Sequence, residues 1–152
     1  MKKLLSSVGI AMLMAAPIVA YATVKPKVDF INSEKAKAAG YPFSQAVQVD
    51  HTLYLSGQIG MDPKTGKLAE GGVASESRQA MQNIKDLLAE HSHSMDDIVK
   101  CTVMLADIKE WPAFNEVYRG FFKNHFPARS AFAGSGLAMG ARVEVECIAV
   151  VD

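Results

Sequence analysis

The chain alternates strand-like runs with two amphipathic helical stretches, and this order limits the possible folds more than any other feature. The stretch 75–91 has one apolar stripe, formed by Ala80, Met81, Ile84, Leu87 and Leu88. A second stripe follows Pro112, which suits a first helical turn, and comprises Phe114, Val117, Tyr118, Phe121 and Phe122. Strand-like runs lie near 28–32 and at 45–49, 52–59, 98–106, 130–133 and 142–151. Helices placed between strands imply crossover connections and some parallel pairing, so we expect one mixed α+β sheet with both helices on one face.

The two faces of this predicted sheet differ in polarity. Alternation predicts a buried face containing Val99, Cys101, Val103 and Leu105 together with Val143, Val145, Cys147 and Ala149. The opposite face carries Thr102, Met104, Glu144 and Glu146. Because that face is neither fully polar nor covered by a predicted helix, we expect it to pack against another subunit.

Residues 1–22 are unlike the rest of the chain. Lys2 and Lys3 precede an apolar run over 8–19, and Ala20-Tyr21-Ala22 follows it, which is typical of a secretory signal. The run is about half of the ~20 residues that a permanent membrane helix needs. We expect cleavage after Ala22, a mature domain over 23–152, and a periplasmic protein with no membrane segment after processing. An uncleaved anchor or a core helix is the alternative.

Charge and cysteine content exclude several classes of protein. Lys and Arg number 16 and Asp and Glu number 16, and this balance argues against a nucleic-acid binder that relies on phosphate contacts. Two cysteines are too few for a disulfide-framed miniprotein or a four-cysteine zinc site. Both are expected to be buried and to act as small hydrophobic residues. A disulfide between Cys101 and Cys147 is the less favoured alternative, because adjacent-strand geometry is restrictive.

Few side chains stand out as candidates for chemistry on their residue type alone. The guanidinium of Arg129 has the geometry to bind a carboxylate through two hydrogen bonds, although a surface salt bridge is the simpler interpretation. Glu144 and Glu146 share a strand face where burial raises a carboxyl pKa, and their alternatives are a solvated face or an ion pair between subunits. His91 and His93 lie near a helix end and have no metal-ligand partner at convincing spacing.

A set of motifs from about Gly40 to the C-terminus occurs in a distinctive order. They are PFSQA (42–46), LSGQI (55–59), DPKTG (62–66), IVKCTV (98–103), FNEVY (114–118), PARS (127–130) and VEVECIAV (143–150). In order and spacing these motifs resemble those of the RidA (YjgF/YER057c) family. The resemblance implies a chorismate-mutase-like α+β subunit and a homotrimer with its sites in clefts between subunits.

The same resemblance implies hydrolytic deamination of reactive enamines and imines. Substrates such as 2-aminoacrylate or 2-iminopropionate would give 2-oxo acids and ammonium, without a cofactor or metal. Arg129 would hold the substrate carboxylate, and Glu144 would activate or orient the attacking water.

The resemblance also implies the other members of the substrate-binding site. Ser56 and Gly57 correspond to the pocket wall, and Asn115 to a hydrogen-bonding position beside it. Phe43 stands where a well-known member has Tyr, and Ala131 stands where Cys is frequent. The missing tyrosine hydroxyl supports an alternative function, a non-catalytic carboxylate-binding or chaperone-like trimer. A ribonuclease is a third hypothesis, which the neutral charge disfavours.

Overall fold

The computed structural model describes residues 24–152, and the predicted signal segment 1–22 lies outside them. The helices and strands follow in the order β1 (Val28–Ile31), α1 (Glu34–Ala39), β2 (Ala46–Val49), β3 (Thr52–Ile59), β4 (Met61–Asp62), β5 (Lys67–Leu68), α2 (Val73–Glu90), β6 (Ile98–Leu105), α3 (Trp111–Arg119), β7 (Ala128–Ala133) and β8 (Val143–Val150). Short 3₁₀ turns occupy Met95–Asp97, Ile108–Glu110 and Ala138–Gly140. The α+β class expected from the sequence is therefore confirmed.

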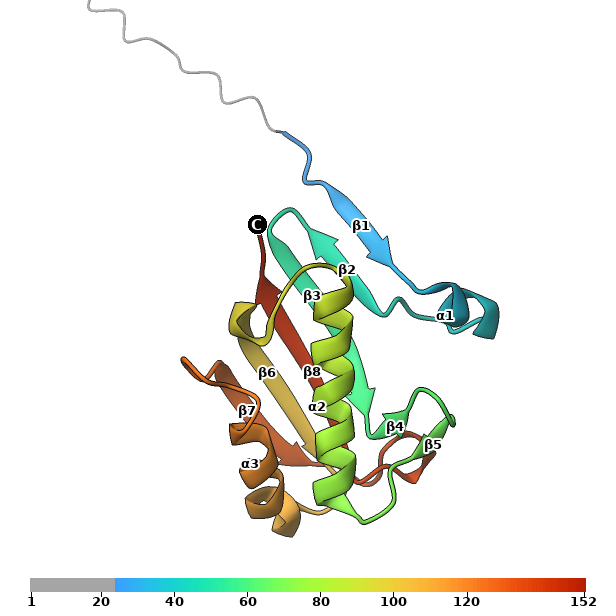
Figure 1. The fold of residues 1–152 in the computed structure, drawn as a ribbon, viewed down its shortest axis with the longest axis vertical. Coiled ribbons are helices and arrows are strands. Elements are labelled where there is room, and N and C mark those ends of the chain that lie inside the picture. Colours follow the sequence, from blue (N-terminus) through green and yellow to red (C-terminus); the bar gives the residue numbers. More distant parts are fainter. Residues whose placement is uncertain (1–23) are drawn as a thin grey trace, which may run out of the picture.

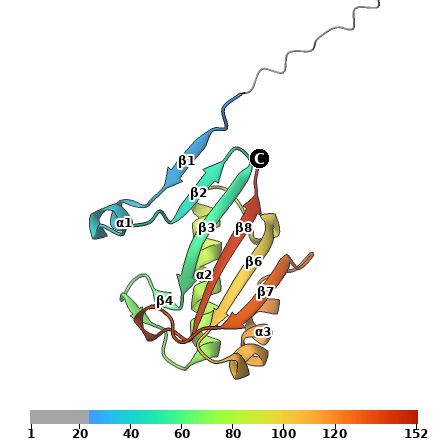
Figure 2. The same cartoon turned by 180° about the vertical axis from the view of Figure 1, so that it is seen from behind.

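Six of the strands form one sheet in the order β1-β2-β3-β8-β6-β7 (Figures 1 and 2). Each neighbouring pair is antiparallel except β6 and β7, which are parallel and are joined through α3. β4 and β5 form a separate two-stranded hairpin. The crossover expected from the second helical stretch therefore places β7 at the edge of the sheet.

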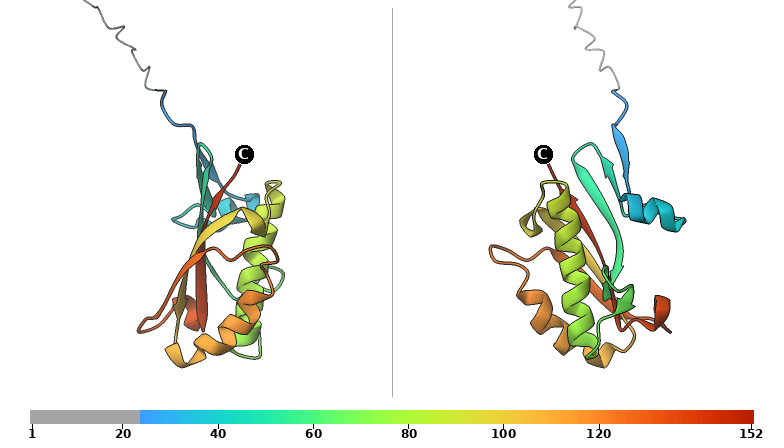
Figure 3. Two further views of the ribbon diagram at one scale, coloured as in Figure 1. Left: turned by 90° about the vertical axis from the view of Figure 1, so that its left-hand side faces the viewer. Right: turned by 45° about the vertical axis from the view of Figure 1, so that its right-hand side comes forward.

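Both long helices cover the same face of the sheet, as the edge-on view in Figure 3 shows. The core lies between this face and the helices, and its fully buried side chains include Ile84, Leu88, Phe114 and Val145. The view from behind in Figure 2 shows no helix over the opposite face. The helical spacing in the sequence thus gave the correct layer arrangement, because each apolar stripe has one sheet surface to cover.

The prediction that Val99 belongs to the buried face of the sheet is wrong. Val99 is 46% exposed, whereas Ile98 is fully buried. The pairing of β6 with β8 shifts register between Ile98 and Lys100, as at a β-bulge. A bulge inserts an extra residue into the alternation, so it turns Val99 outward while Cys101, Val103 and Leu105 stay inside.

The short helix α1 was not expected from the sequence. Ser33 begins it, since its side chain accepts a hydrogen bond from the Ala36 N–H. Gly40 ends it at a φ of 65°, in the left-handed region that glycine adopts without strain. Two caps thus define a helix of only six residues, too short to produce a recognisable apolar stripe.

The expectation of free cysteines is also wrong, because Cys101 and Cys147 form a disulfide. They are direct cross-strand partners on β6 and β8, with Cα atoms 4.1 Å apart. Both face the core and are almost completely buried. The strand register supplies the close approach that the sequence alone could not establish.

Candidate active site at the edge of the sheet

Arg129 lies on the edge strand β7, on the side of the sheet that the helices cover. Its register partner on β6 is the buried Cys101, and paired residues in a ladder share a face. α3 lies beside β7 on this face (Figure 1) and presents three aromatic rings to the guanidinium. The Cζ atom of Arg129 is 5.9 Å from the ring centroid of Trp111, 5.7 Å from that of Phe114 and 4.6 Å from that of Tyr118.

The simpler interpretation of Arg129, a surface salt bridge, does not hold for the described part of the chain. The ion pairs within residues 24–152 join Lys27 to Asp29, Lys37 to Glu34, Arg119 to Glu116 and Arg142 to Glu110, and none includes Arg129. The half-buried guanidinium therefore keeps its N–H groups available for an anion that does not belong to residues 24–152 of the same subunit.

A cavity of about 250 Å³ opens beside Arg129. It is lined by Ile108, Trp111, Arg129 and Ala131. Ile108 and Trp111 are each partly exposed at this surface, and Ala131 lies two residues beyond Arg129 on the same face of β7. A cavity that combines apolar side chains with one cationic group is suited to a small organic anion.

Two polar side-chain atoms on α3 are buried without a hydrogen-bond partner among residues 24–152. They are Asn115 Oδ1 and Tyr118 Oη. Residues 111, 115 and 118 are spaced for one side of a helix, so Asn115 shares the side that carries Trp111 and Tyr118. Burial raises the pKa of Tyr118 to about 12, while the positive charge of Arg129 acts in the opposite direction. The phenol of Tyr118 therefore stays neutral over the physiological range.

Glu144 lies on the central strand β8 and points to the opposite face of the sheet. Its neighbours Val143 and Val145 are buried in the core, and strand alternation turns Glu144 away from it. Its cross-strand partners are Ile59 on β3 and Met104 on β6. Glu146 follows on the same face opposite Thr102 and is exposed.

Gly57 is the residue against which the Glu144 carboxylate packs. A Cβ atom built on Gly57 would collide with Glu144 Oε1, so every larger residue would displace the carboxylate. Gly57 lies within the irregular part of β3, where the pairing with β8 shifts register between Leu55 and Gln58. The close approach explains why the LSGQI motif has glycine at this position.

Ser56, beside Gly57 on β3, is hydrogen-bonded to the segment that follows Phe43. The Ser56 hydroxyl donates a 2.6 Å hydrogen bond to the Ser44 carbonyl oxygen, and the Ser56 N–H donates to Gln45 O at 3.0 Å. These two hydrogen bonds connect β3 to the segment that precedes β2. The exposed Phe43 ring stacks on Tyr41, with centroids 5.2 Å apart and planes 3° from parallel.

The predicted site residues thus fall into two groups that one subunit does not bring together. Arg129 and Ala131 lie on the helix-covered face, with Asn115 on the helix above them. Glu144 points to the other face, where it packs on Gly57. A single copy of the chain therefore carries the guanidinium of Arg129 and the carboxylate of Glu144 on opposite sides of its sheet.

Sequence reasoning missed the aromatic surroundings of Arg129. From the sequence, Phe114 and Tyr118 are placed in an apolar helical stripe and in the FNEVY motif, and Trp111 is given no role. Their spacing at 111, 114 and 118 was visible in the sequence and predicts one helix side. What the sequence lacks is the evidence that this side faces the arginine of the following strand.

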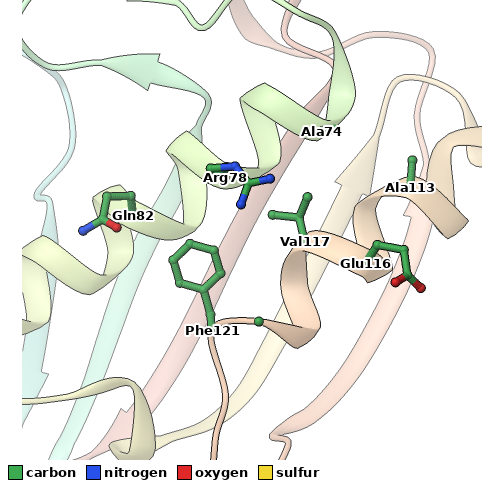
Figure 4. Close-up of a pocket in the computed structure, with 8 residues that line it drawn as sticks. Ala74, Arg78, Gln82, Ala113, Glu116, Val117 and Phe121 are labelled. Carbon is green, nitrogen blue, oxygen red and sulfur yellow. The ribbon is translucent and has the colours of Figure 1, made fainter.

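A larger cavity of about 580 Å³ lies between α2 and α3 (Figure 4). Its lining includes Arg78 and Gln82 from α2, Val117 from α3, and Phe121 just beyond it. Figure 4 shows the Phe121 ring in the space between the two helices. None of the predicted site residues lines this groove.

Within 24–152, no group of three or more His, Cys, Asp or Glu side chains is placed to hold a metal ion. Over the same range, no helix has the length and apolar character needed to cross a membrane.

Comparisons with known proteins extend over most of the chain. The family described as Endoribonuclease L-PSP matches residues 33–151. A human protein named 2-iminobutanoate/2-iminopropanoate deaminase is 47% identical over 120 residues, which cover 79% of this chain and 88% of the human one. Among solved structures, RidA from an Antarctic Psychrobacter species is 37% identical with a TM-score of 0.74, covering 81% of this chain and 99% of that one. TdcF from E. coli with bound serine is 32% identical with a TM-score of 0.69, covering 74% and 90% respectively.

Proposed function

This chain belongs to the Endoribonuclease L-PSP family, which includes RidA, and we propose that it is a deaminase that hydrolyses small 2-imino acids to 2-oxo acids and ammonium. The observation that carries the proposal is Arg129, a guanidinium without an acidic partner in the described chain that lines a cavity of about 250 Å³. An enamine such as 2-aminoacrylate enters the same reaction after it tautomerises to the imine.

Arg129 recognises the feature that all of these substrates share, the carboxylate. Two parallel N–H donors of the guanidinium bind the two carboxylate oxygens and fix the orientation of the imine carbon. The imine carbon is already electrophilic, so positioning supplies much of the rate enhancement. Asn115, with a buried amide oxygen that lacks a partner, would accept a hydrogen bond from the substrate nitrogen.

Glu144 would provide the acid–base step. Its carboxylate takes a proton from a water molecule as the water oxygen bonds to the imine carbon. Glu144 returns this proton to the nitrogen of the tetrahedral intermediate formed from the protonated imine, and the C–N bond then breaks while Glu144 takes the hydroxyl proton and the ketone forms. The ammonia that leaves takes up this second proton and becomes ammonium. One water is consumed, and one 2-oxo acid and one ammonium ion are formed.

Because Arg129 and Glu144 lie on opposite faces of one sheet, the complete site would form between two copies of the chain. The face without helices carries partly exposed apolar side chains on several strands, including Phe30, Tyr54, Phe132 and Val150. Burial of such a surface in a closed, symmetric assembly supports the homotrimer expected from the resemblance.

Export to the periplasm is part of the proposal. Lys2 and Lys3, the apolar run 8–19 and the Ala20-Tyr21-Ala22 site support cleavage after Ala22. The Cys101–Cys147 disulfide supports the same location, since disulfides persist mainly in oxidising compartments. The mature protein recovered from the periplasm is expected to have the mass of residues 23–152.

A non-catalytic trimer that binds small carboxylates is the second candidate function. It is favoured by Phe43, which lacks the hydroxyl that a tyrosine would provide at this position. Such a protein would be stabilised against heat by 2-oxo acids but would not release ammonium. The name of the family also suggests a nuclease, but equal numbers of acidic and basic residues give little attraction for a phosphate backbone.

The proposed activity is tested by release of 2-oxo acid and ammonium from enzymatically generated 2-iminopropionate. We expect Arg129→Ala to lower kcat/KM by about 30-fold to several thousand-fold, because loss of one partner of a desolvated ion pair costs about 2–5 kcal/mol. Wild-type protein that releases product no faster than buffer would exclude the deaminase.

Subunit complementation tests the two-copy site. Arg129→Ala and Glu144→Gln proteins are each expected to be inactive, but unfolding them together and refolding allows mixed trimers to form. A random equal mixture would restore about a quarter of the wild-type activity, because each shared site draws one half from each neighbour. Mixed trimers without any recovered activity would show that the two residues act in the same subunit or not at all.

A further inference from the structure

Three aromatic rings surround the guanidinium of Arg129, and no acidic side chain within residues 24–152 forms an ion pair with it. Its Cζ atom lies 4.6 Å from the Tyr118 ring centroid, 5.7 Å from that of Phe114 and 5.9 Å from that of Trp111. All three rings come from α3, and none of the ion pairs within residues 24–152 includes the guanidinium. We refer to Trp111, Phe114 and Tyr118 together as the aromatic cradle.

The kind of partner decides what Arg129 can still bind. A neighbouring Asp or Glu would occupy two of the five guanidinium N–H donors and cancel the charge. An aromatic face attracts the cation through its quadrupole but need not occupy the in-plane N–H groups. An arginine held by rings therefore keeps both its charge and its bidentate edge for a ligand.

We propose that Trp111 and Tyr118 are positioning residues for substrate recognition, whose rings hold Arg129 in place while its N–H edge stays free for the carboxylate of a small 2-oxo or 2-imino acid. The identity of this anion rests on the proposed function, but the arrangement of the cradle does not. Neither residue needs to take part in proton transfer.

The three rings differ in burial, and this decides which of them can be substituted without disturbing the core. Phe114 is fully buried and Tyr118 nearly so, and both pack in the hydrophobic core. Trp111 is 42% exposed, begins α3 and lines the cavity beside Arg129. Substitution of Trp111 therefore removes one wall of the cradle without leaving a void in the core, whereas Tyr118 is best tested by a change that keeps its ring.

The test is calorimetric binding of 2-oxobutanoate together with steady-state kinetics on 2-iminopropionate. Trp111→Leu is expected to weaken binding and raise KM by about 3- to 10-fold, a typical effect of a cation–π contact, with kcat changed less than about twofold. Trp111→Phe keeps an aromatic face and should restore most of the binding. Tyr118→Phe keeps the ring and removes only an unpartnered hydroxyl, so a loss of binding in this variant would assign the effect to the hydroxyl and overturn the role of the aromatic face.

The outcomes separate this inference from the proposed activity. Unchanged binding by Trp111→Leu, or an equal loss in Trp111→Phe, would overturn the aromatic cradle. A kcat that falls as far as KM rises in Trp111→Leu would do the same, since it would point to a general distortion of the site. If the wild type binds 2-oxobutanoate through Arg129 and Trp111 but does not turn over imines, the inference stands and the deaminase is excluded.

Discussion

Reduction of the Cys101–Cys147 disulfide is expected to destabilise the protein by about 4 kcal/mol. The cysteines are 46 residues apart, and closing a loop of this length removes about that much conformational free energy from the unfolded chain. For a domain of this size the same change lowers Tm by roughly 10–15 °C. Reduction keeps both sulfur atoms in the core, so no cavity contributes to the effect.

The assay compares two samples of the same protein in urea, with the fluorescence of Trp111, the chain's only tryptophan, as the probe. Both cysteines are almost completely buried, so a reductant reaches the bond only when the fold opens. One sample is therefore unfolded and refolded in reductant, and the other is kept oxidised throughout. The double variant Cys101→Ala/Cys147→Ala is the control, and its unfolding should not respond to reductant.

Two results would refute this reasoning. Oxidised and reduced samples with free energies of unfolding equal within about 0.5 kcal/mol would mean that the crosslink contributes nothing. Two thiols that react in protein purified and unfolded without reductant would mean that the bond does not form.

Three further predictions follow from close contacts and from burial. Gly57→Ala is expected to lower kcat by about 10²-fold, because its methyl group would displace the Glu144 carboxylate; an unchanged kcat would separate Glu144 from the reaction. Gly60→Ala is expected to destabilise the fold by about 1–3 kcal/mol, measured in urea, since its Cβ would collide with the backbone of Glu76 on α2. Tyr118 has a folded-state pKa of about 12 against 10.0 for an exposed phenol, so its contribution is complete below pH 10 and is lost as pH rises toward 12. The free energy of unfolding should fall over this interval by at most about 3 kcal/mol more in wild type than in Tyr118→Phe, and identical pH profiles would contradict the shift.

The parts of the fold that the sequence predicted are those set by local periodicity. The apolar stripe from Ala80 to Leu88 repeats at helical spacing, and a helix with such a stripe has one way to cover a sheet. Val99 was misplaced because a bulge depends on how β6 pairs with β8, which its own neighbours do not encode. The cysteine pair was misjudged for a related reason, since strand register decides which residues lie opposite one another.

The sequence predicted the residues of the site and, through the family resemblance, a cleft between subunits, but it did not predict the face of the sheet on which Arg129 lies. Motif resemblance singled out Arg129 and Glu144, and their roles remain predictions. Strand alternation in the sequence placed Glu144 on the face without helices, but the side of Arg129 depends on how β7 aligns with β6. The aromatic cradle lies on a separate element, α3, and its contact with β7 arises only when the crossover closes.

The positions of Arg129 and Glu144 in the sheet determine how the two groups can meet. Arg129 is on an edge strand, where no further strand covers the open side of β7 in the described chain. Glu144 is on a central strand, so within one subunit the sheet itself separates its carboxylate from the cradle. No side-chain rotation carries either group through a hydrogen-bonded sheet. If both groups act in the proposed deaminase, a second subunit whose face meets the open edge has to supply the second group. Dilution that dissociates the proposed trimer should therefore abolish turnover while the isolated fold stays intact, because the Cys101–Cys147 disulfide and the core lie within one chain.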